Sequence, residues 1–434
     1  MGLSCKAINM NILLIETPCD RLDNDKIDPP IGLLSLATHI KENGFNVKVL
    51  DLSSTTSSEW MDLIPENYDV IGFRTVCISY PQTLLLKMIA LEKNPKAITV
   101  AGGPQASSVP DIVAHDFDYV ITGEGEFELL ELIRKIDAEI NTKKNRVIHA
   151  SPINPDTIAF PDYSLVNIAD YCRIINGQKA IAVLTSRGCG YNCAYCNSSI
   201  FGGSTKYRPL NLNSLNRHLS RLISEYGINS FKFVDDNFLG PNHLRRAVDI
   251  YENIKNLDIS YRCYLRVDQS NYETITLLKK SGCKHITFGI ESGDNIVLKS
   301  MRRGYTSDQI ISGVNIAYDL GLTVRICIMV GFPPFESDNT ILNTISLISR
   351  LRFHEYFVYP FIPYPKCDVS NNPAKYDIKD IDNDYSKYLQ IGKNKASGYV
   401  FSTNSYGPSE IKNWQAKIMQ HLSATKIWIG DSNT

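Results

Sequence analysis

The chain has 434 residues, 43% of them hydrophobic and 21% charged, which is the composition of a globular protein with room for about two or three domains. Its formal net charge of −1 provides no basic surface for nucleic acid or for an anionic membrane. No apolar run approaches the roughly 18 residues of a membrane span, and the N-terminus has neither a secretory nor a myristoylation signal. We therefore expect a cytoplasmic protein that acts on a small-molecule substrate, with no nucleic-acid or membrane partner.

Residues 1–140 alternate short apolar strands with helical stretches, which predicts an α/β domain. The expected strands are MNILLIETP, NVKVLDLS, YDVIGFRTV, AITVAGG and FDYVITGEGE. Joined through helices, they predict a parallel sheet buried on both faces, either Rossmann-like or flavodoxin-like. Ligands bind such sheets beyond the carboxyl ends of the strands, which here are residues 16–30, 74–81, 102–110 and 122–126. The glycine pairs in these segments could equally be tight turns.

A second βα series follows a polar, proline-bearing segment at residues 141–178, which we expect to be a linker. Over residues 179–368 the expected strands are AIAVLTSRGC, SFKFVDDNF, ISYRCYLRVD, HITFGIESG, TVRICIMVGFP and YFVYPFIPYP. This pattern predicts a partial (β/α)6 TIM-type barrel, whose chemistry lies at the carboxyl ends of the strands. Residues 369–434 are more polar, contain one expected helix over 409–422, and are predicted to form a small C-terminal cap.

Three cysteines, Cys189, Cys193 and Cys196, follow the first barrel strand. Gly188 and Gly190 stand beside them and allow the backbone to curl around a bulky ligand. Structural zinc is one interpretation, but it takes four protein ligands, and no second CxxC or HxxxH motif completes the set. A four-iron cluster normally takes four thiolates. Three thiolates in one loop would therefore leave one iron open for another ligand.

The segment CGYNCAYC, residues 189–196, resembles the CxxxCxxC signature of the radical S-adenosylmethionine (SAM) enzymes. The resemblance implies that the three cysteines hold a [4Fe–4S] cluster and that SAM chelates the fourth iron. It continues through FVDDNF, FGIESG and VGFP at the ends of predicted barrel strands. A pair of aspartates at a strand end is, by itself, more often a solvated turn or helix cap. The residues that the resemblance places near SAM are Tyr195, Asp235, Asp236, Glu291, Ser292, Gly331 and Pro333.

The same resemblance implies the reaction. In this family one electron reduces the cluster, SAM is cleaved to methionine, and the 5′-deoxyadenosyl radical abstracts a hydrogen from the substrate. A reducing partner, a flavodoxin or a ferredoxin-type protein, is implied as well. The protein would position the cofactor and exclude water, since the electronic chemistry belongs to the cofactor.

The first domain, with VAGGPQAS and ITGEGEFELLEL before such a barrel, resembles that of the cobalamin-binding subclass. The resemblance places a corrin over the carboxyl edge of the sheet, facing the barrel mouth. The DxHxxG motif is absent, the four strand-end segments hold no histidine, and Gln105 stands where relatives often have histidine. We therefore expect no histidine below the cobalt, whose lower face would meet residues 74–79. A domain kept as a scaffold without cobalamin is the alternative. The residues expected near cobalamin are Arg74, Thr75, Val76, Cys77, Gly102, Gly103, Gln105, Gly123 and Glu124.

Together the two resemblances imply a cobalamin-dependent C-methyltransferase that acts on an unactivated carbon of a small metabolite or natural-product intermediate. One SAM molecule would methylate cobalamin and a second would generate the substrate radical. The alternative is a radical SAM rearrangement, ring contraction, dehydrogenation or cyclisation without methyl transfer, with or without cobalamin. An iron–sulfur or zinc regulatory protein would need a readout surface, and the sequence has no basic helix for one.

His39 and His285 are most simply structural, and Tyr356, Tyr359 and Tyr364 could equally face substrate or form barrel core.

Removal of any one cysteine of the motif should abolish SAM cleavage, because a cluster that loses one of three thiolates is under-ligated. Anaerobically reconstituted protein should carry about four iron per chain. Cys189→Ala, Cys193→Ala and Cys196→Ala should each form no 5′-deoxyadenosine when assayed by liquid chromatography. Full cleavage activity in any of the three variants would contradict the radical SAM interpretation.

Overall fold

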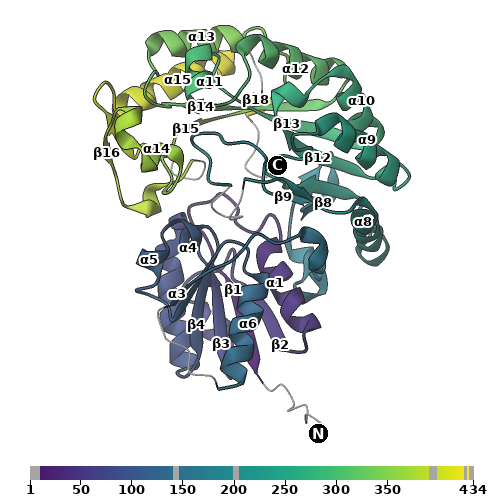
Figure 1. Ribbon diagram of the computed structural model, residues 1–434, viewed down its shortest axis with the longest axis vertical. Coiled ribbons are helices and arrows are strands. Elements are labelled where there is room, and N and C mark those ends of the chain that lie inside the picture. The colour runs from purple at the N-terminus through teal and green to yellow at the C-terminus, as the bar shows by residue number, and fades with distance from the viewer. Residues whose placement is uncertain (1–9, 140–145, 199–204, 391–397, 425–427, 430–434) are drawn as a thin grey trace. The chain divides into compact units, whose positions relative to one another are not determined.

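The chain folds into two compact units, of which the first ends at Cys172 and the second begins at Arg173 (Figure 1). The structure is a computed structural model that describes residues 10–139, 146–198, 205–390, 398–424 and 428–429. Each unit contains one large, mainly parallel β-sheet with helices packed against it.

The first unit is built on a six-stranded parallel sheet in the order β2-β1-β3-β4-β5-β6. Residues 12–15 of β1 are apolar and buried, as a strand covered on both faces requires. The predicted parallel α/β domain is therefore confirmed, and the order of its first five strands is flavodoxin-like. The strands are β1 (Asn11–Glu16), β2 (Asn46–Asp51), β3 (Val70–Arg74), β4 (Ile98–Gly102), β5 (Tyr119–Thr122) and β6 (Arg146–His149).

Helices cover both faces of this sheet (Figure 1). On one face, α1 (Ile31–Glu42) packs against α6 (Glu126–Asp137), and Ser35 Oγ donates a 2.9 Å hydrogen bond to Glu126 Oε1. The opposite face carries a core that includes Trp60, Leu86 and Val113. The elements that supply this core include α2 (Trp60–Leu63), α3 (Tyr80–Lys93), α4 (Pro104–Ser108) and α5 (Pro110–Val113).

Strand β6 was not among the predicted strands. It lies in the segment interpreted as a linker, and its four residues, RVIH, are too short and too mixed to predict a strand from periodicity. It pairs in parallel with β5, with Thr122 opposite His149. The carboxyl edge of the sheet therefore ends in one more strand than the sequence indicated, and the last residue of that strand is a histidine. Three 3-10 helices follow it: η2 (Pro155–Thr157), η3 (Tyr163–Leu165) and η4 (Ile168–Asp170).

The second unit is a curved sheet in the order β18-β15-β14-β13-β12-β11-β8-β7. Its six central strands are parallel, which confirms the predicted partial barrel. β7 (Ile174–Ile175) pairs antiparallel with β8, and β18 (Trp428–Ile429) extends the other edge. The six central strands are β8 (Gln178–Val183), β11 (Ser230–Phe233), β12 (Ser260–Leu265), β13 (Cys283–Glu291), β14 (Thr323–Val330) and β15 (Glu355–Pro360).

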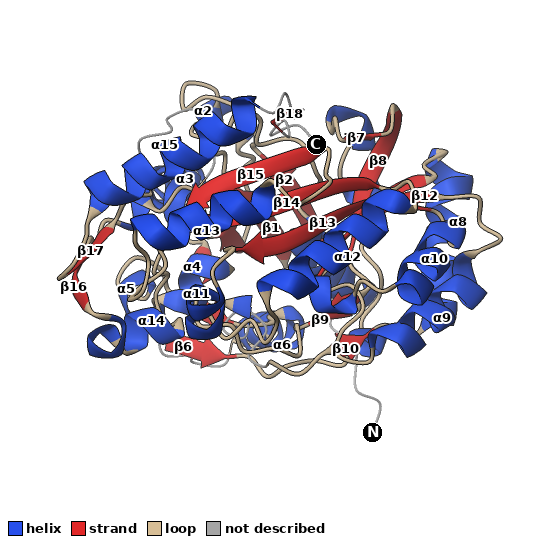
Figure 2. Cartoon of the chain, turned by 90° about the horizontal axis from the view of Figure 1, so that it is seen from above, coloured by secondary structure: helices blue, strands red, loops and turns tan. Residues whose placement is uncertain are grey.

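Helices lie along one face of this sheet (Figure 2). Apolar side chains of the strands, among them Phe231, Phe288 and Ile326, are fully buried. Alternate residues of the same strands are mostly polar, so the face away from the helices is a polar one. The helices are α8 (Leu212–Tyr226), α9 (His243–Ile254), α10 (Tyr272–Lys280), α11 (Asn295–Ser300), α12 (Ser307–Asp319) and α13 (Asp338–Ile348).

The C-terminal residues complete the second unit. Helix α15 (Pro408–Ala424) covers the predicted helix and packs against β15 and α13. A small antiparallel pair, β16 (Ile378–Ile381) and β17 (Phe401–Thr403), was not predicted. Two shorter elements are α14 (Asp368–Asn371) and η6 (Pro373–Tyr376).

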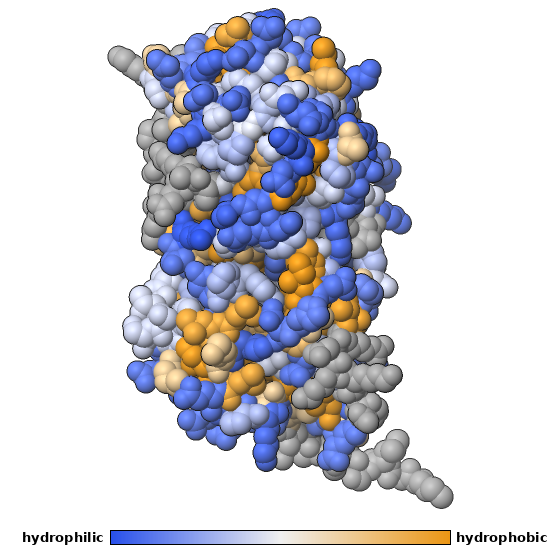
Figure 3. All heavy atoms as spheres, turned by 90° about the vertical axis from the view of Figure 1, so that its left-hand side faces the viewer, coloured by the Kyte–Doolittle hydropathy of each residue, from blue (hydrophilic) through white to orange (hydrophobic). Residues whose placement is uncertain are grey.

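Some hydrophobic side chains are exposed at the surface. On the face of the molecule in Figure 3, they gather in several patches with hydrophilic side chains between them. The exposed hydrophobic residues include Leu85 and Met88 on α3, Ile112 on α5 and Phe335 after β14. None of the described helices is long and apolar enough to cross a membrane.

Candidate functional site

The three cysteines occupy one loop that begins after a short strand, β9 (Ser186–Arg187). All three are partly exposed. The backbone N–H of Ala194 donates a 3.0 Å hydrogen bond to the carbonyl of Met301, which anchors the loop to the residue after α11. Gly190 has φ +84, and a Cβ there would lie 2.6 Å from Pro241 Cγ, so only glycine fits at this position.

The chemistry of this loop fits an iron–sulfur cluster. Burial, with the neighbouring thiols and Asp236, raises the pKa of Cys189 to about 12, and burial also raises the pKa of Cys196. A positively charged metal centre is therefore needed to hold these sulfurs as thiolates. Among the described residues, no three or more His, Cys, Asp or Glu side chains converge as a single-ion site. In a cluster each cysteine binds a different iron, so the sulfurs need not converge on one point.

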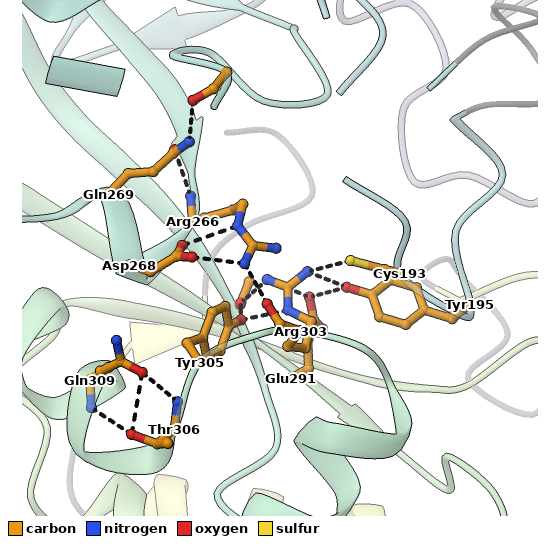
Figure 4. A network of polar contacts seen from close by, with 12 residues as sticks. Cys193, Tyr195, Arg266, Asp268, Gln269, Glu291, Arg303, Tyr305, Thr306 and Gln309 are labelled. Atoms are coloured by element: carbon orange, nitrogen blue, oxygen red, sulfur yellow. Dashed lines mark hydrogen bonds and ion pairs between the residues drawn. The ribbon is translucent and has the colours of Figure 1, made fainter. Parts of the chain in front are cut away.

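A buried arginine that the sequence did not single out, Arg303, organises the surroundings of the cluster loop (Figure 4). Its Nη1 donates to Cys193 Sγ at 3.5 Å and to the Tyr195 hydroxyl at 2.5 Å. Its Nη2 donates to the carbonyl of Gly289 at 2.7 Å, and its Nε donates to the Tyr305 hydroxyl at 2.6 Å. One guanidinium thereby connects a predicted cluster ligand to the end of β13.

Glu291 lies at the same place, as the last residue of β13, with φ +62 and only 4% of its surface exposed. Its carboxylate accepts hydrogen bonds from the hydroxyls of Tyr195 at 3.1 Å and Tyr359 at 2.9 Å. Arg303 Nη2 lies 3.9 Å from Glu291 Oε1. A Cβ on Gly289 would come within 2.4 Å of the same oxygen, so the absence of a side chain there makes room for the carboxylate. Glu291 and Tyr195, predicted from separate motifs, are thus neighbours.

A second arginine, Arg266, contacts the backbone of Arg303. Arg266 donates through Nε and Nη2 to both oxygens of Asp268, at 3.0 and 2.9 Å, and also to the carbonyl of Arg303. Its guanidinium carbon lies 3.8 Å from the centre of the Tyr191 ring, inside the cluster loop. Gln269 Nε2 donates to the carbonyl of Gly240. The polar network therefore reaches from the cluster loop through β13 to the end of β12 (Figure 4).

The two predicted aspartates have different surroundings. Asp235 is 2% exposed, and its Oδ1 accepts hydrogen bonds from Thr185 N, Thr185 Oγ1 and Ser186 Oγ at 2.9, 3.1 and 2.5 Å. This side chain secures the chain between β8 and the cluster loop. Asp236 is exposed, and its negative charge contributes to the raised pKa values of Cys189 and Cys196. Asp236 is therefore the aspartate that faces the cysteines.

The remaining residues predicted near SAM lie beyond β13 and β14. Ser292 Oγ accepts from the N–H of Asp294 at 3.1 Å and is 1% exposed, so its hydroxyl supports the turn after β13. Gly331 has φ +87, and its N–H donates to the buried carboxylate of Glu336 at 3.2 Å. The next residue, Phe332, packs its ring edge-on against Tyr195. Pro333 follows, and its carbonyl accepts from Ser300 Oγ at 3.3 Å.

The residues expected near cobalamin all lie at the carboxyl edge of the first sheet, but several are engaged within that unit. Thr75 is fully buried, and its Oγ1 donates to the carbonyl of Gly102 at 2.8 Å and accepts from the N–H of Ala106. Gly103 has φ +94, and a Cβ there would lie 3.2 Å from the Thr75 carbonyl. Gln105 is 4% exposed. These residues therefore shape the loops at the carboxyl edge of the first sheet.

The other five residues expected near cobalamin lie at the same edge. The Arg74 guanidinium pairs with Glu16, and Val76 is partly exposed beside Cys77, whose pKa burial raises to about 11. Gly123 donates its N–H to Ser107 Oγ at 2.9 Å, whereas Glu124 accepts from the N–H of Ile153 at 2.8 Å. Arg74, at the end of β3, is therefore partly exposed, as are Val76, Cys77 and Ile78 in the loop that follows.

One expectation about this edge was incomplete. The four predicted strand-end segments hold no histidine, but β6 ends in His149, which is exposed. The Nδ1 atom of His149 lies 3.1 Å from Thr122 Oγ1. This imidazole escaped the sequence interpretation because β6 itself was not predicted.

Comparison with known proteins finds a known domain in each part of the chain. Residues 183–348 match the Radical SAM superfamily, and residues 26–133 match the B12 binding domain. The uncharacterized methyltransferase PH0819 of Pyrococcus horikoshii is 29% identical over 380 residues, which cover 82% of this chain and 81% of that protein. The cytidylyl-2-hydroxyethylphosphonate methyltransferase of Streptomyces wedmorensis is 24% identical over 385 residues, covering 72% and 71% of the two chains.

Two solved structures share the fold. The radical SAM methyltransferase TsrM from Kitasatospora setae, with tryptophan substrate and a SAM analogue bound, aligns with a TM-score of 0.69 at 18% identity, over 84% of this chain and 76% of that one. The cobalamin-dependent SAM radical enzyme OxsB, with aqua-cobalamin and SAM bound, aligns with a TM-score of 0.64 at 18% identity, over 98% of this chain and 64% of that one. The chain therefore carries a Radical SAM domain and a B12-binding domain, as the resemblances in its sequence implied. The predicted class of enzyme and its cofactors, a [4Fe–4S] cluster, SAM and cobalamin, are confirmed by the same matches.

Glu291→Ala should weaken SAM binding by roughly one to two orders of magnitude, because charge-assisted hydrogen bonds contribute about 1.5–3 kcal/mol. Iron content should be unchanged, since Glu291 is not a cluster ligand. Equilibrium binding of SAM to the reconstituted protein measures the effect, with Glu252→Gln on the exposed side of α9 as the control. Equal affinity of parent and Glu291→Ala would show that this carboxylate is structural.

Asp235 should make the stability of the protein depend on pH. Burial raises its pKa from about 4 in the unfolded chain to about 6 in the folded one, despite its hydrogen bonds to Ser186 and Thr185 and the charge of Arg246. The folded state therefore favours the protonated carboxyl, and the stability that it gains below pH 4 is lost as the pH rises through 6. Relative to Asp235→Asn, the parent should lose on the order of 3 kcal/mol of unfolding free energy between pH 4 and pH 7. Urea denaturation at fixed pH values measures this, and a difference independent of pH would refute it.

Proposed function

We propose that this protein is a cobalamin-dependent radical SAM methyltransferase that transfers a methyl group to a carbon atom of a small-molecule substrate. The proposal depends mainly on one observation in the second unit. Arg303 donates hydrogen bonds to Cys193 and Tyr195 of the cluster loop and to the carbonyl of Gly289, which stands two residues before Glu291. The chain carries a B12-binding domain in addition. The relatives and solved structures described above are methyltransferases or cobalamin-dependent radical enzymes.

The residues that would hold the cluster and SAM follow from the geometry. Cys189, Cys193 and Cys196 would bind three irons, and the fourth iron would be left for SAM. The carboxylate of Glu291 would accept hydrogen bonds from polar groups of SAM, sharing or replacing those from Tyr195 and Tyr359. Arg303 would remain a positioning residue, since its donors are used by Cys193, Tyr195, Tyr305 and Gly289.

The first unit would bind cobalamin at the carboxyl edge of its sheet. Gly102, Gly103 and Gly123 allow close backbone approach there. Arg74, Val76 and Cys77 are partly exposed at the end of β3 and just after it, and would contact the corrin. When bound, the cluster supplies the electron that cleaves SAM, and cobalamin carries the methyl group between SAM and substrate. The chain's own residues orient these groups and exclude water.

The proposal also includes a small-molecule substrate, a reducing protein partner and a cytoplasmic location. The substrate is a small molecule, as tryptophan is for TsrM. The cluster must be reduced by one electron. A flavodoxin or a ferredoxin-type protein in the cytoplasm would supply that electron.

Cobalamin-dependent formation of S-adenosylhomocysteine tests the proposal. Methyl donation by SAM yields S-adenosylhomocysteine, whereas reductive cleavage yields 5′-deoxyadenosine and methionine. Protein reconstituted with iron and sulfide, then reduced, should form S-adenosylhomocysteine only when hydroxocobalamin has been added. Formation of 5′-deoxyadenosine with no S-adenosylhomocysteine, with or without hydroxocobalamin, would favour the alternative of a radical rearrangement, ring contraction, dehydrogenation or cyclisation.

A further inference from the structure

A pocket at the surface of the second unit has no part in the site described above. It has a volume of about 730 Å³ and is lined by residues of α11, of the segment after β14 and of η6. Two of its lining residues are large, hydrophobic and exposed: Ile296 is 61% exposed and Phe335 is 53% exposed. Exposed hydrophobic side chains that share one pocket indicate a surface that binds a partner.

Three cations also line this pocket. Lys299, Arg302 and Lys375 are exposed there, and none of the lining residues that the structure describes is acidic. Asp368 lies 3.2 Å from the Arg302 guanidinium and 2.9 Å from Lys375 Nζ, so this one carboxylate offsets part of their charge. Lys299 forms no ion pair with any described residue. The pocket therefore keeps a net positive charge, which favours an acidic partner.

The backbone after α11 connects the pocket to the cluster loop. Arg302 lines the pocket. The residue before it, Met301, accepts a 3.0 Å hydrogen bond from the N–H of Ala194 in the cluster loop. The residue after it, Arg303, donates to Cys193 Sγ at 3.5 Å (Figure 4). One residue of the pocket is thus flanked on both sides by residues that contact the cluster loop.

Aromatic rings form a second connection between the pocket and the cluster loop. Tyr376 lines the pocket and packs edge-on against Phe332, with the ring centres 6.0 Å apart. Phe332 packs in the same way against Tyr195, with the ring centres 6.2 Å apart. Tyr195 directly precedes the predicted cluster ligand Cys196. Because electron transfer slows steeply with distance, a redox protein bound at this pocket would be well placed to reduce the cluster.

We propose that this pocket is the docking site of a flavodoxin-type electron carrier. The inference rests on the proposed function, which requires a reductant, and it assigns the surface that receives that reductant. A flavodoxin fits because the edge of its flavin ring is apolar and the protein around it is acidic, which complements Ile296 and Phe335 among the three cations.

The electron transfer itself is balanced without any further reactant. The anionic hydroquinone of the flavin loses one electron and becomes the neutral semiquinone. The cluster gains that electron, and no proton is transferred. The residues of the pocket take no part in this chemistry, since they only hold the flavodoxin with its flavin near the cluster loop.

Binding of purified, oxidised flavodoxin to the reconstituted holoenzyme tests the surface without turnover, so the result does not depend on whether the protein methylates a substrate. Calorimetry at low ionic strength should show saturable binding to the parent, and added salt should weaken it. Lys299→Glu should weaken binding about tenfold, because it replaces attraction by repulsion at an exposed position. Phe335→Ser should weaken binding as well, because it removes apolar contact area.

Reduction of the cluster is a second readout, followed by electron paramagnetic resonance. Below saturation, flavodoxin hydroquinone should reduce the cluster of Lys299→Glu about tenfold more slowly than that of the parent. Dithionite is a small reductant that needs no docking surface, so it should reduce both clusters at the same rate. Equal reduction by dithionite also shows that the variant is folded and holds an intact cluster.

Lys280→Glu is the matched control, because it makes the same change of charge at an exposed lysine in the last turn of α10. It should bind flavodoxin and accept electrons as the parent does. Equal flavodoxin binding by the parent and Lys299→Glu, or no saturable binding by the parent, would overturn the proposal. Equal weakening by Lys280→Glu would overturn it too, since only the overall charge would then matter. Binding of a ferredoxin but not of flavodoxin would also contradict it.

Discussion

The buried guanidinium of Arg303 is the interaction on which the site in the second unit depends. It donates hydrogen bonds to side chains of the cluster loop, to the β13 backbone and to Tyr305, and its own carbonyl accepts from Arg266. A buried charge is stabilised only while its partners stay in place, and removal of one partner costs several kcal/mol. The cluster loop, the end of β13 and the segment after α11 are therefore positioned together. This coupling lets a loop of small and polar residues hold a defined geometry next to Glu291.

Side chains alternate along the barrel strands, so the residues that form the hydrophobic core and those that can meet ligands lie on opposite faces of the sheet. Residues such as Phe231, Phe288 and Ile326 lie beneath the helices and form the core. Their neighbours in sequence, among them Lys232 and Arg325, point to the opposite face, where polar groups can meet ligands. The carboxyl ends of the strands carry Glu291 and Tyr359 on this polar face. One sheet thereby supports both the hydrophobic core and the candidate site.

Much of this organisation could be predicted from the sequence. The parallel sheets follow from apolar runs separated by helical periodicity, and the cysteine spacing identifies the cluster loop without any structure. Glu291 and Tyr195 were expected near SAM because their motifs occur in order along the barrel. The structure adds that they contact each other. Asp235 instead holds the chain before the cluster loop, a distinction from Asp236 that depends on which way each side chain points.

Other features had no signal in the sequence. Arg303 stands in a stretch with no motif, and the sequence left open whether Tyr359 faces substrate or forms barrel core. Only tertiary folding brings both to Glu291. Strand β6 is four residues long with mixed polarity, so it was missed, and His149 at its end was missed with it. Lys232, Arg262 and Arg325 are far apart in the sequence, and only strand register brings the strands that carry them side by side.

Electron paramagnetic resonance of the doubly reconstituted, reduced protein tests the central claim most directly, because it observes the cluster and the cobalt in one sample. The account predicts a reduced [4Fe–4S] signal that changes when SAM is added, since SAM binds the open iron. It also predicts a Co(II) signal without the splitting that a nitrogen ligand produces. A cluster signal indifferent to SAM, or a protein that retains no corrinoid after reconstitution with hydroxocobalamin, would contradict the account.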